Sequence, residues 1–227
     1  MNVNNFEAVT VRKNRFISLM RRLARPILFK YYSKEFNNIV LKNVMGKHFV
    51  VLPKVFHPGL FFTSKFFVSC LNKETVKETN LVLDMGTGSG IAAIFAADYC
   101  KRVIATDINP YVVRCAKINV MLNNLEDKIE VRGGDLFEPV EGEKFDVILH
   151  NPPFYPGNPK DWLEYALKTG DNNEVVFRFI RDAGKHLNPG GRILVILSTD
   201  AAINAILNEF KNNGYTITLI ASKRNIG

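Results

Sequence analysis

The chain has 227 residues, a length typical of a single domain, and 47% of its residues are hydrophobic and 11% aromatic. That composition excludes a disordered chain. The sequence contains no run of about 18 apolar residues, so no transmembrane helix is predicted. Arg21, Arg22 and Arg25 interrupt the only apolar stretch that would fit a signal peptide. The three cysteines are too scattered for a disulfide framework or a zinc site, so free thiols, no bound metal and a cytoplasmic location are expected.

The net charge of +8 is confined to one window near the N-terminus. The basic residues of this window, which contains no Asp or Glu, are Arg12, Lys13, Arg15, Arg21, Arg22, Arg25, Lys30 and Lys34. The rest of the chain is neutral, because the remaining basic residues balance the 22 acidic ones. Such a segment is typical of an RNA contact, of a solvated helix face or of adhesion to anionic lipid.

The N-terminal segment has a helical pattern. Apolar residues recur at helical spacing, at Phe16, Met20, Leu23 and Ile27. This spacing predicts a basic amphipathic helix over about residues 11–29. Residues 1–48 are therefore assigned to a basic helical N-terminal extension and residues 49–227 to the main domain, which opens with a strand-like run over residues 49–52 and an aromatic segment over residues 55–67.

From Asn80 onward, short apolar runs alternate with helical patterns. The predicted strands cover residues 81–83, 103–106, 129–132, 145–149, 192–197 and 216–221. The predicted helices cover residues 91–99, 110–123, 174–187 and 200–213. This alternation predicts an α/β domain with a doubly wound, mostly parallel sheet.

A glycine-rich turn, Asp84–Gly90, lies between the first strand and the first helix of this pattern. Its glycines, Gly86, Gly88 and Gly90, let the backbone turn tightly and approach a ligand closely. Ligands of doubly wound sheets bind at the carboxyl ends of the strands. The spacing is G-x-G-x-G with Asp84 ahead of it, whereas NAD-binding folds use G-x-G-x-x-G. The turn therefore predicts a ligand site that differs from a nicotinamide site.

Two further acidic residues follow strands of the predicted sheet. Asp107 ends the second strand, where a carboxylate accepts hydrogen bonds from both hydroxyls of a ribose, although it also fits a helix N-cap. Asp135 follows the third strand and Gly133-Gly134, and it fits a ligand contact and a turn equally well when it is considered alone.

The motif Asn151-Pro152-Pro153-Phe154 lies at the carboxyl end of the fourth strand. Two consecutive prolines fix the backbone there. The side-chain oxygen of Asn151 and the carbonyl of Pro152 can each accept a hydrogen bond from a planar NH2 group, and Phe154 can stack on a flat amide or base. No general base is needed, because the proton can leave after the nitrogen has become cationic. The motif therefore predicts catalysis at a nitrogen by orientation and a polar environment, with Asn151, Pro152, Pro153 and Phe154 as catalytic residues.

In these motifs and their order, the chain resembles the class I S-adenosylmethionine-dependent methyltransferases from about Val50 to the end. The resemblance implies a Rossmann-like methyltransferase fold and S-adenosylmethionine as the cofactor. It also implies that Asp135 contacts the adenine amino group and that Thr63 or Ser64 closes over the methionine end. The implied cofactor-binding residues are Asp84, Gly86, Thr87, Gly88, Gly90, Asp107, Ile108, Asp135, Leu136, Asn151 and Thr63.

Within that family, the Asn-Pro-Pro-aromatic form belongs to enzymes that modify amide or exocyclic nitrogens. The stretch over residues 152–180 is most similar to HemK-type protein-glutamine methyltransferases, which implies a glutamine side-chain amide of a translation-associated protein as the acceptor. RNA methyltransferases that modify the adenine N6 or guanine N2 amino group carry the same Asn-Pro-Pro-Phe motif and remain the alternative. In either case the segment Arg12–Lys34 is expected to contact RNA.

Two other classes are weighed against an N-methyltransferase. A nicotinamide dehydrogenase would leave Asn151–Phe154 without a role, and a catalytically silent RNA-binding relative would not need the intact glycine turn. The family sheet usually finishes with two strands, the last of them inserted between the fifth and the sixth. The sequence ends at Gly227, soon after the sixth predicted strand, so we expect either an early end of the domain or a longer natural chain.

Overall fold

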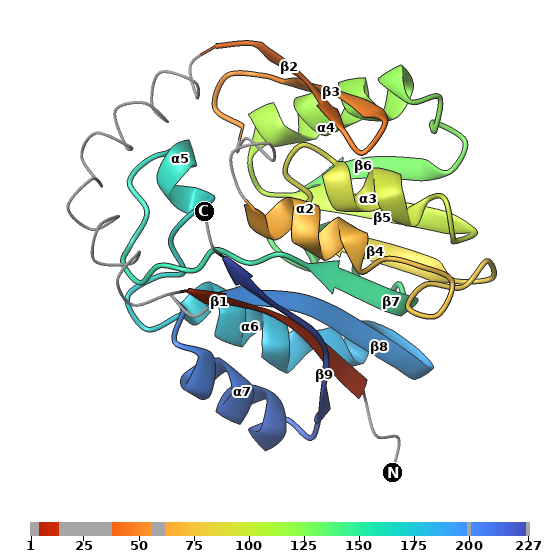
Figure 1. Cartoon of the computed structure of the whole chain (residues 1–227). Helices are drawn as coiled ribbons and strands as arrows, with labels where there is room; N and C mark the ends of the chain where they lie inside the picture. The colour runs from red at the N-terminus through yellow and green to blue at the C-terminus, as the bar shows by residue number, and fades with distance from the viewer. Residues whose placement is uncertain (1–4, 14–37, 56–61, 199–200, 226–227) are drawn as a thin grey trace.

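The computed structural model describes residues 5–13, 38–55, 62–198 and 201–225. A seven-stranded sheet forms the centre of the molecule, in the order β6-β5-β4-β7-β8-β1-β9 (Figure 1). All neighbouring pairs in this sheet are parallel. Its strands are β1 (Asn5–Lys13), β4 (Leu81–Met85), β5 (Arg102–Asp107), β6 (Ile129–Gly133), β7 (Phe145–His150), β8 (Leu187–Ser198) and β9 (Thr216–Asn225). The predicted doubly wound, mostly parallel sheet is confirmed.

Helices cover both faces of the sheet (Figure 1). On one face lie α2 (Phe62–Ser69), α3 (Ile91–Ala96) and α4 (Pro110–Leu122). On the other lie α6 (Glu174–Ala183) and α7 (Ile203–Asn212), and the short helix α5 (Trp162–Tyr165) stands beside the carboxyl edge. Alternate residues of the central strands point into two apolar cores, as Val82 and Leu83 of β4 do. No helix among the described residues is both long enough and apolar enough to cross a membrane.

Strand β1 corrects the prediction for the N-terminus. Residues 11–13, expected to begin a helix, form the end of β1, and residues 5–13 lie in the central sheet and not in a helical extension. The physical reason is burial on both faces, because Phe6 and Ala8 enter one core and Val9 enters the other. The rest of the predicted helix, residues 14–29, lies outside the described residues, and the boundary at residue 48 stays a prediction.

Strand β1 also occupies the position between the fifth and sixth predicted strands, to which the sequence analysis assigned no strand. It lies between β8 and β9, pairing Ala8 with Val195 on one side and with Leu219 on the other. The N-terminal strand thus occupies the position that we expected of a strand after β9. An early end of the domain and a longer natural chain were the two alternatives, and in the described residues a strand from the opposite end of the chain occupies this position.

Helix α6 ends earlier and strand β8 begins earlier than predicted. The α-helix ends at Ala183 and is followed by a single turn of 3-10 helix (Gly184–His186), so it is shorter than expected. Strand β8 starts at Leu187, and its register against β7 shifts between the pairs Phe145–Leu187 and Val147–Arg192. The Asn-Pro-Gly-Gly stretch is therefore an irregularity within the strand and not a separate loop.

A two-stranded antiparallel hairpin, β2 (Val40–Val44) and β3 (Lys47–Val51), lies over α4. The buried side chain of Asn119 fixes it there, accepting a hydrogen bond from the Val50 amide at 2.7 Å and donating to the Val50 carbonyl at 2.8 Å. The same side chain donates to the carbonyl of Ser89 in the glycine turn at 2.8 Å. The hairpin is therefore tied directly to the predicted ligand site.

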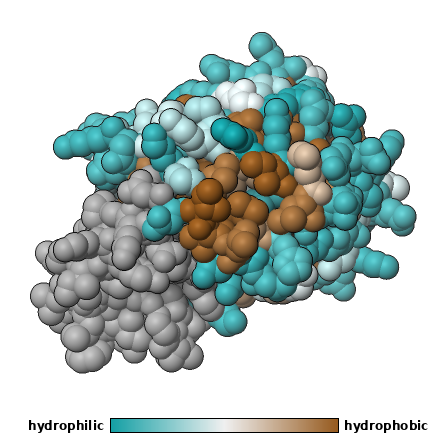
Figure 2. Space-filling model, turned by 90° about the horizontal axis from the view of Figure 1, so that it is seen from above, coloured by the Kyte–Doolittle hydropathy of each residue, from teal (hydrophilic) through white to brown (hydrophobic). Residues whose placement is uncertain are grey.

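Seen from the side of this hairpin, the surface shows apolar side chains gathered in one patch (Figure 2). The exposed large apolar residues on the hairpin and the residue before it are Ile39, Leu41 and Met45. A second group on this side of the sheet, Ile108 and Tyr111, lies where β5 leads into α4. Ile108 is one of the predicted cofactor contacts, so its exposure leaves an apolar surface at the carboxyl edge.

Candidate active site

The carboxyl ends of four neighbouring strands bring the predicted site residues to one edge of the sheet. Met85 of β4 is in register with Thr106 of β5 and with His150 of β7, and Asp107 is in register with Gly133 of β6. Asp107 is the last residue of β5. The other predicted residues of this edge each follow one of these strands: the glycine turn, Ile108, Asp135 with Leu136, and Asn151. Motifs that are scattered along the sequence are thus adjacent in space, as expected for a doubly wound sheet.

The shape of the glycine turn depends on its backbone conformation and on Asp84. Gly86, Gly88 and Gly90 have φ angles of 68°, 59° and 84°. L-residues that carry a side chain rarely adopt such angles. A Cβ atom on Gly88 would meet no atom of the described residues within 4 Å, so the backbone conformation and not crowding by these residues requires glycine there. A free space of this kind beside exposed backbone suits the close approach of a ligand.

Asp84 supports the turn from inside the fold. Its Oδ2 accepts hydrogen bonds from the Thr87 hydroxyl at 2.6 Å and from the Ala93 amide of α3 at 3.0 Å. Both Asp84 and Thr87 are buried, and burial raises the pKa of Asp84 to about 6 although both hydrogen bonds lower it. Both side chains are thus hydrogen-bonded within the protein and support the shape of the turn, and their contact with a cofactor stays a prediction.

Asp107 lies between the glycine turn and the start of α4. Its Oδ2 accepts a hydrogen bond from the Gly88 amide at 3.2 Å and its Oδ1 from the Asn109 amide at 2.9 Å. Burial raises the pKa of Asp107 to about 6, against these backbone hydrogen bonds. The predicted N-cap role belongs to Asn109, which accepts from the Tyr111 amide, so Asp107 keeps oxygen lone pairs for a ligand.

Asp135 and Leu136 lie in the turn after β6. The Asp135 carboxylate forms an ion pair with Arg178 of α6 at 2.7 Å, which the sequence did not reveal because the two residues are distant in the chain. Leu136 has a positive φ of 47° and is half-buried against the core on the α6 side. Asp135 is thus located as predicted, but Arg178 shares its carboxylate.

Asn151 follows β7 and faces α2. Its Nδ2 lies 3.4 Å from the hydroxyl oxygen of the buried Ser64, whereas its Oδ1 is buried and has no hydrogen-bond partner in the part of the chain that the structure describes. A buried acceptor without a partner is rare in folded proteins and marks a place where a donor is missing. Of the two residues named for this position, Ser64 and not Thr63 makes the contact with Asn151. Pro152 is buried, and Phe154 is partly buried against the core on the α3 side of the sheet.

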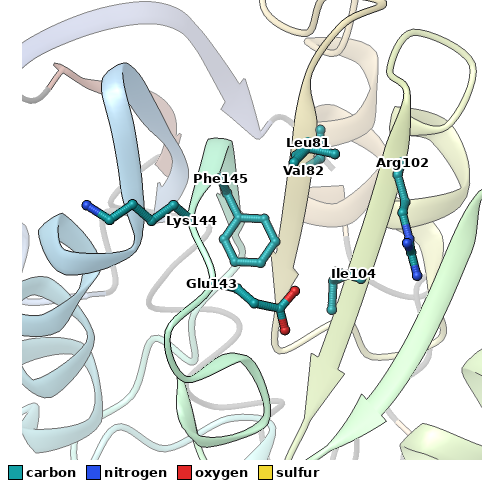
Figure 3. Close-up of a pocket in the computed structure, with 7 residues that line it drawn as sticks. All are labelled: Leu81, Val82, Arg102, Ile104, Glu143, Lys144 and Phe145. Atoms are coloured by element: carbon teal, nitrogen blue, oxygen red, sulfur yellow. The ribbon is translucent and has the colours of Figure 1, made fainter.

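A separate small pocket lies at the opposite edge of the sheet (Figure 3). Leu81, Arg102 and Phe145, which line it, are the first residues of their strands, whereas the predicted site residues of β4 to β7 lie at or beyond the carboxyl ends of these strands. The pocket therefore does not belong to the candidate active site.

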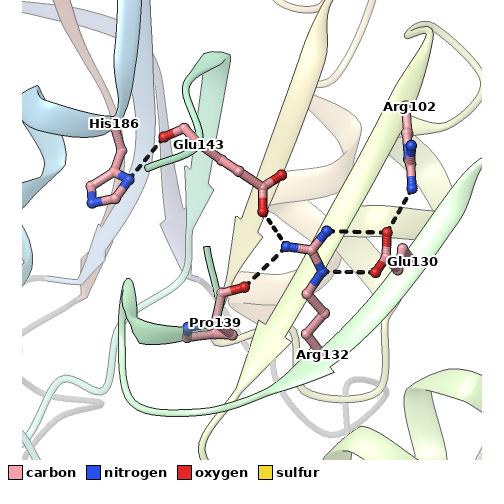
Figure 4. A network of polar contacts seen from close by, with 6 residues as sticks. All are labelled: Arg102, Glu130, Arg132, Pro139, Glu143 and His186. Atoms are coloured by element: carbon pink, nitrogen blue, oxygen red, sulfur yellow. Dashed lines mark hydrogen bonds and ion pairs between the residues drawn. The ribbon is translucent and has the colours of Figure 1, made fainter. Parts of the chain in front are cut away.

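Near that pocket, a polar network joins β5, β6 and the segment that leads into β7 (Figure 4). Arg132 pairs with Glu130 at 2.8 Å and with Glu143, and Arg102 also pairs with Glu130 at 2.6 Å. The Glu143 carbonyl oxygen accepts a hydrogen bond from the Nδ1 of His186 at 2.9 Å. These half-exposed ion pairs orient the strands and contribute little to stability, since water screens them.

Comparisons with known proteins match the greater part of the chain. The family model described as methyltransferase small domain matches residues 47–221. A putative protein N5-glutamine methyltransferase of Methanocaldococcus jannaschii is 33% identical over 171 residues, which are 73% of this chain and 85% of that protein. The release factor glutamine methyltransferase of Clostridium acetobutylicum is 37% identical over 148 residues, and the match spans 59% of this chain and about half, 52%, of that relative.

Solved structures show the same fold. The T. thermophilus 16S rRNA N2 G1207 methyltransferase, in complex with AdoMet and guanosine, has a TM-score of 0.59 at 23% identity and covers 76% of this chain and 45% of its own. A ribosomal protein L11 methylase from Lactobacillus delbrueckii has a TM-score of 0.50 at 27% identity, with 66% of both chains covered.

Proposed function

Because the chain belongs to the methyltransferase small domain family, whose model matches residues 47–221, we propose that it transfers a methyl group from S-adenosylmethionine to a glutamine side-chain amide of a translation-associated protein. Relatives named as protein-glutamine and release factor glutamine methyltransferases support this acceptor. S-adenosylmethionine is the cofactor, and it supplies an electrophilic methyl group on a sulfonium centre.

The observation that carries the proposal is the unpartnered Oδ1 of Asn151. An acceptor amide has two N–H donors on a planar nitrogen, and Asn151 Oδ1 and the Pro152 carbonyl can accept one each. These two hydrogen bonds orient the nitrogen and favour the loss of its planarity as it becomes bonded to the methyl group. Phe154, two residues after Pro152, provides an apolar face for the flat amide. The residues therefore act by positioning and by electrostatic stabilisation.

The remaining residues of the edge fit the cofactor. Gly86 and Gly88 provide accessible backbone, Asp107 provides carboxylate oxygens for the ribose hydroxyls, and the exposed Ile108 provides an apolar surface for the adenine. Leu136 lies beyond the end of the neighbouring strand β6, where it can cover the other side of the ring. Thr63, half-buried on α2, lies one residue from the Asn151 contact and can close the methionine end.

The affinity for S-adenosylhomocysteine is expected to depend on pH through Asp107. Because the pKa of Asp107 is raised to about 6, lowering the pH through 6 protonates the carboxylate that accepts the ribose hydroxyls. The dissociation constant, measured by calorimetry between pH 5 and pH 8, should therefore rise as the pH falls below about 6. Asp107→Ala should weaken binding by about 1–3 kcal/mol at pH 8.

Asp107→Asn is the matched control for this pH dependence, since it keeps the shape of the side chain and cannot titrate. Asp84 also has a pKa near 6, so any dependence that survives in Asp107→Asn belongs to Asp84. An unchanged pH profile in this variant would contradict the role of Asp107.

The acceptor is proposed to be presented in an RNA-containing assembly, which Arg12–Lys34 contacts. Strand β1 runs parallel to β8 and β9, so Arg12 and Lys13 lie at the same edge of the sheet as the active site. Arg12 is in register with Arg224, and Val11 with Lys223. The backbone thus brings basic residues of two strands to this edge, a placement that suits binding to phosphates.

The acceptor class can be identified by radiolabelled methyl transfer into an extract of cells that lack the protein. Protease should release the label from macromolecular material, and RNase should leave it in protein. Label that RNase removes would instead support methylation of an adenine or guanine amino group in RNA. Charge reversal at Arg12 and Lys13 should reduce transfer into the intact assembly at low salt and leave transfer into an isolated peptide unchanged.

A further inference from the structure

His150, the residue immediately before Asn151, has no role in the chemistry described so far. It is 4% exposed, and its ring packs on Phe179 of α6 with centroids 4.2 Å apart. Its Nδ1 lies 2.9 Å from the carbonyl oxygen of Met85, its partner in register on β4. Met85 is the residue that leads into the glycine turn. One side chain therefore connects the start of the cofactor turn to the start of the catalytic motif.

The partners of the ring determine its tautomer. A carbonyl oxygen can only accept a hydrogen bond, so Nδ1 carries the proton and donates it to Met85. The buried Nε2 has no hydrogen-bond partner among the described residues and is an unprotonated acceptor in the neutral ring. A proton on Nε2 would create a buried charge with an unpaired donor, and burial accordingly lowers the pKa of His150 to about 4. The ring is thus neutral near pH 7.

We propose that His150 is a positioning residue, which sets the distance between the cofactor turn and Asn151 through the Nδ1–H hydrogen bond to the Met85 carbonyl. Methyl transfer requires the sulfonium methyl and the acceptor nitrogen in line and close together, and these two partners are held by different strands, β4 and β7. The ladder between β4 and β7 ends at the pair Met85–His150, and the side-chain hydrogen bond adds a link between the two strands at this last pair. A displacement of about 1 Å at this point is enough to slow the reaction about 100-fold.

Three substitutions separate this role from packing. The amide nitrogen of asparagine can occupy the place of Nδ1, whereas that of glutamine reaches the place of Nε2. We expect His150→Phe and His150→Gln to lower kcat by about 10- to 100-fold, and His150→Asn to stay within about 3-fold of the wild type. The KM of the acceptor and the affinity for S-adenosylhomocysteine should change by less than about 3-fold in all three variants, since no ligand contact is lost.

Phe179→Leu is the packing control, because it disturbs the ring stack and keeps the hydrogen bond. It should lower the melting temperature without lowering kcat. Equal losses of kcat in the Asn and Gln variants, full activity of His150→Phe, or rescue by Gln in place of Asn would each overturn the proposal.

A second measurement does not depend on the acceptor. Nitrogen-15 NMR of the wild-type protein should show a neutral His150 with the proton on Nδ1 from pH 5 to pH 8, and a proton on Nε2 would contradict the geometry. This inference rests on the proposed methyl transfer at Asn151. Its failure is distinguishable, because a wrong acceptor changes the labelled product, whereas a wrong role for His150 changes only the tautomer or the ranking of the variants.

Discussion

Asn151→Ala is expected to reduce turnover by about 100-fold or more, with the affinity for S-adenosylhomocysteine nearly intact. The substitution removes the buried Oδ1 acceptor, the atom that we assign to the acceptor amide. Steady-state kinetics together with calorimetry on the same preparation would separate the two effects.

Ser64→Ala is the matched control for Asn151→Ala. It removes the hydroxyl near Asn151 Nδ2 but leaves Oδ1 in place, so its effect on turnover should be about 10-fold at most. A fully active Asn151→Ala enzyme would refute the mechanism. An equal loss in both variants would show that the orientation of the side chain, and not its oxygen, limits the rate.

Phe6→Ala is expected to destabilise the fold by about 3–5 kcal/mol, because it empties a fully buried site in the central sheet. The Phe6 ring stacks on that of Phe210, with centroids 3.7 Å apart, and so joins β1 to α7. Urea denaturation would give the free energy of unfolding. The active site should be lost in the same transition, since β1 lies in the sheet that carries it.

Glu7→Ala provides the comparison within the same strand. Glu7 forms an ion pair with Arg192 at 3.2 Å that remains partly exposed, so its removal should cost about 1 kcal/mol or less. A cost below about 1 kcal/mol for Phe6→Ala as well would contradict the assignment of β1 to the central sheet.

The sequence predicted the carboxyl edge well because its signals are local. Gly86, Gly88 and Gly90 fall between a strand and a helix, and Asn151–Phe154 directly follows an apolar strand, so each motif carries its own structural context. The parallel sheet then brings the motifs together without further information. The strands β4 to β7 therefore matched the prediction to within one or two residues.

The N-terminus was predicted poorly because its structure depends on distant partners. The run from Phe6 to Val11 lacks the alternation of a strand with one solvated face, since β1 is buried on both faces between β8 and β9. The contacts of Asn151 with Ser64 and of Asp135 with Arg178 were hidden for the same reason. Pairings of this kind are fixed by packing across the fold and leave no periodic signal in the chain.

Acid hydrolysis of the radiolabelled product tests the central claim most directly. Hydrolysis of an N-methylated glutamine amide breaks the amide bond and leaves the methyl group on the released amine. If the site at Asn151 methylates glutamine, chromatography of the hydrolysate will therefore show labelled methylamine. Label that stays on a purine base, or on another amino acid, would contradict the proposed acceptor.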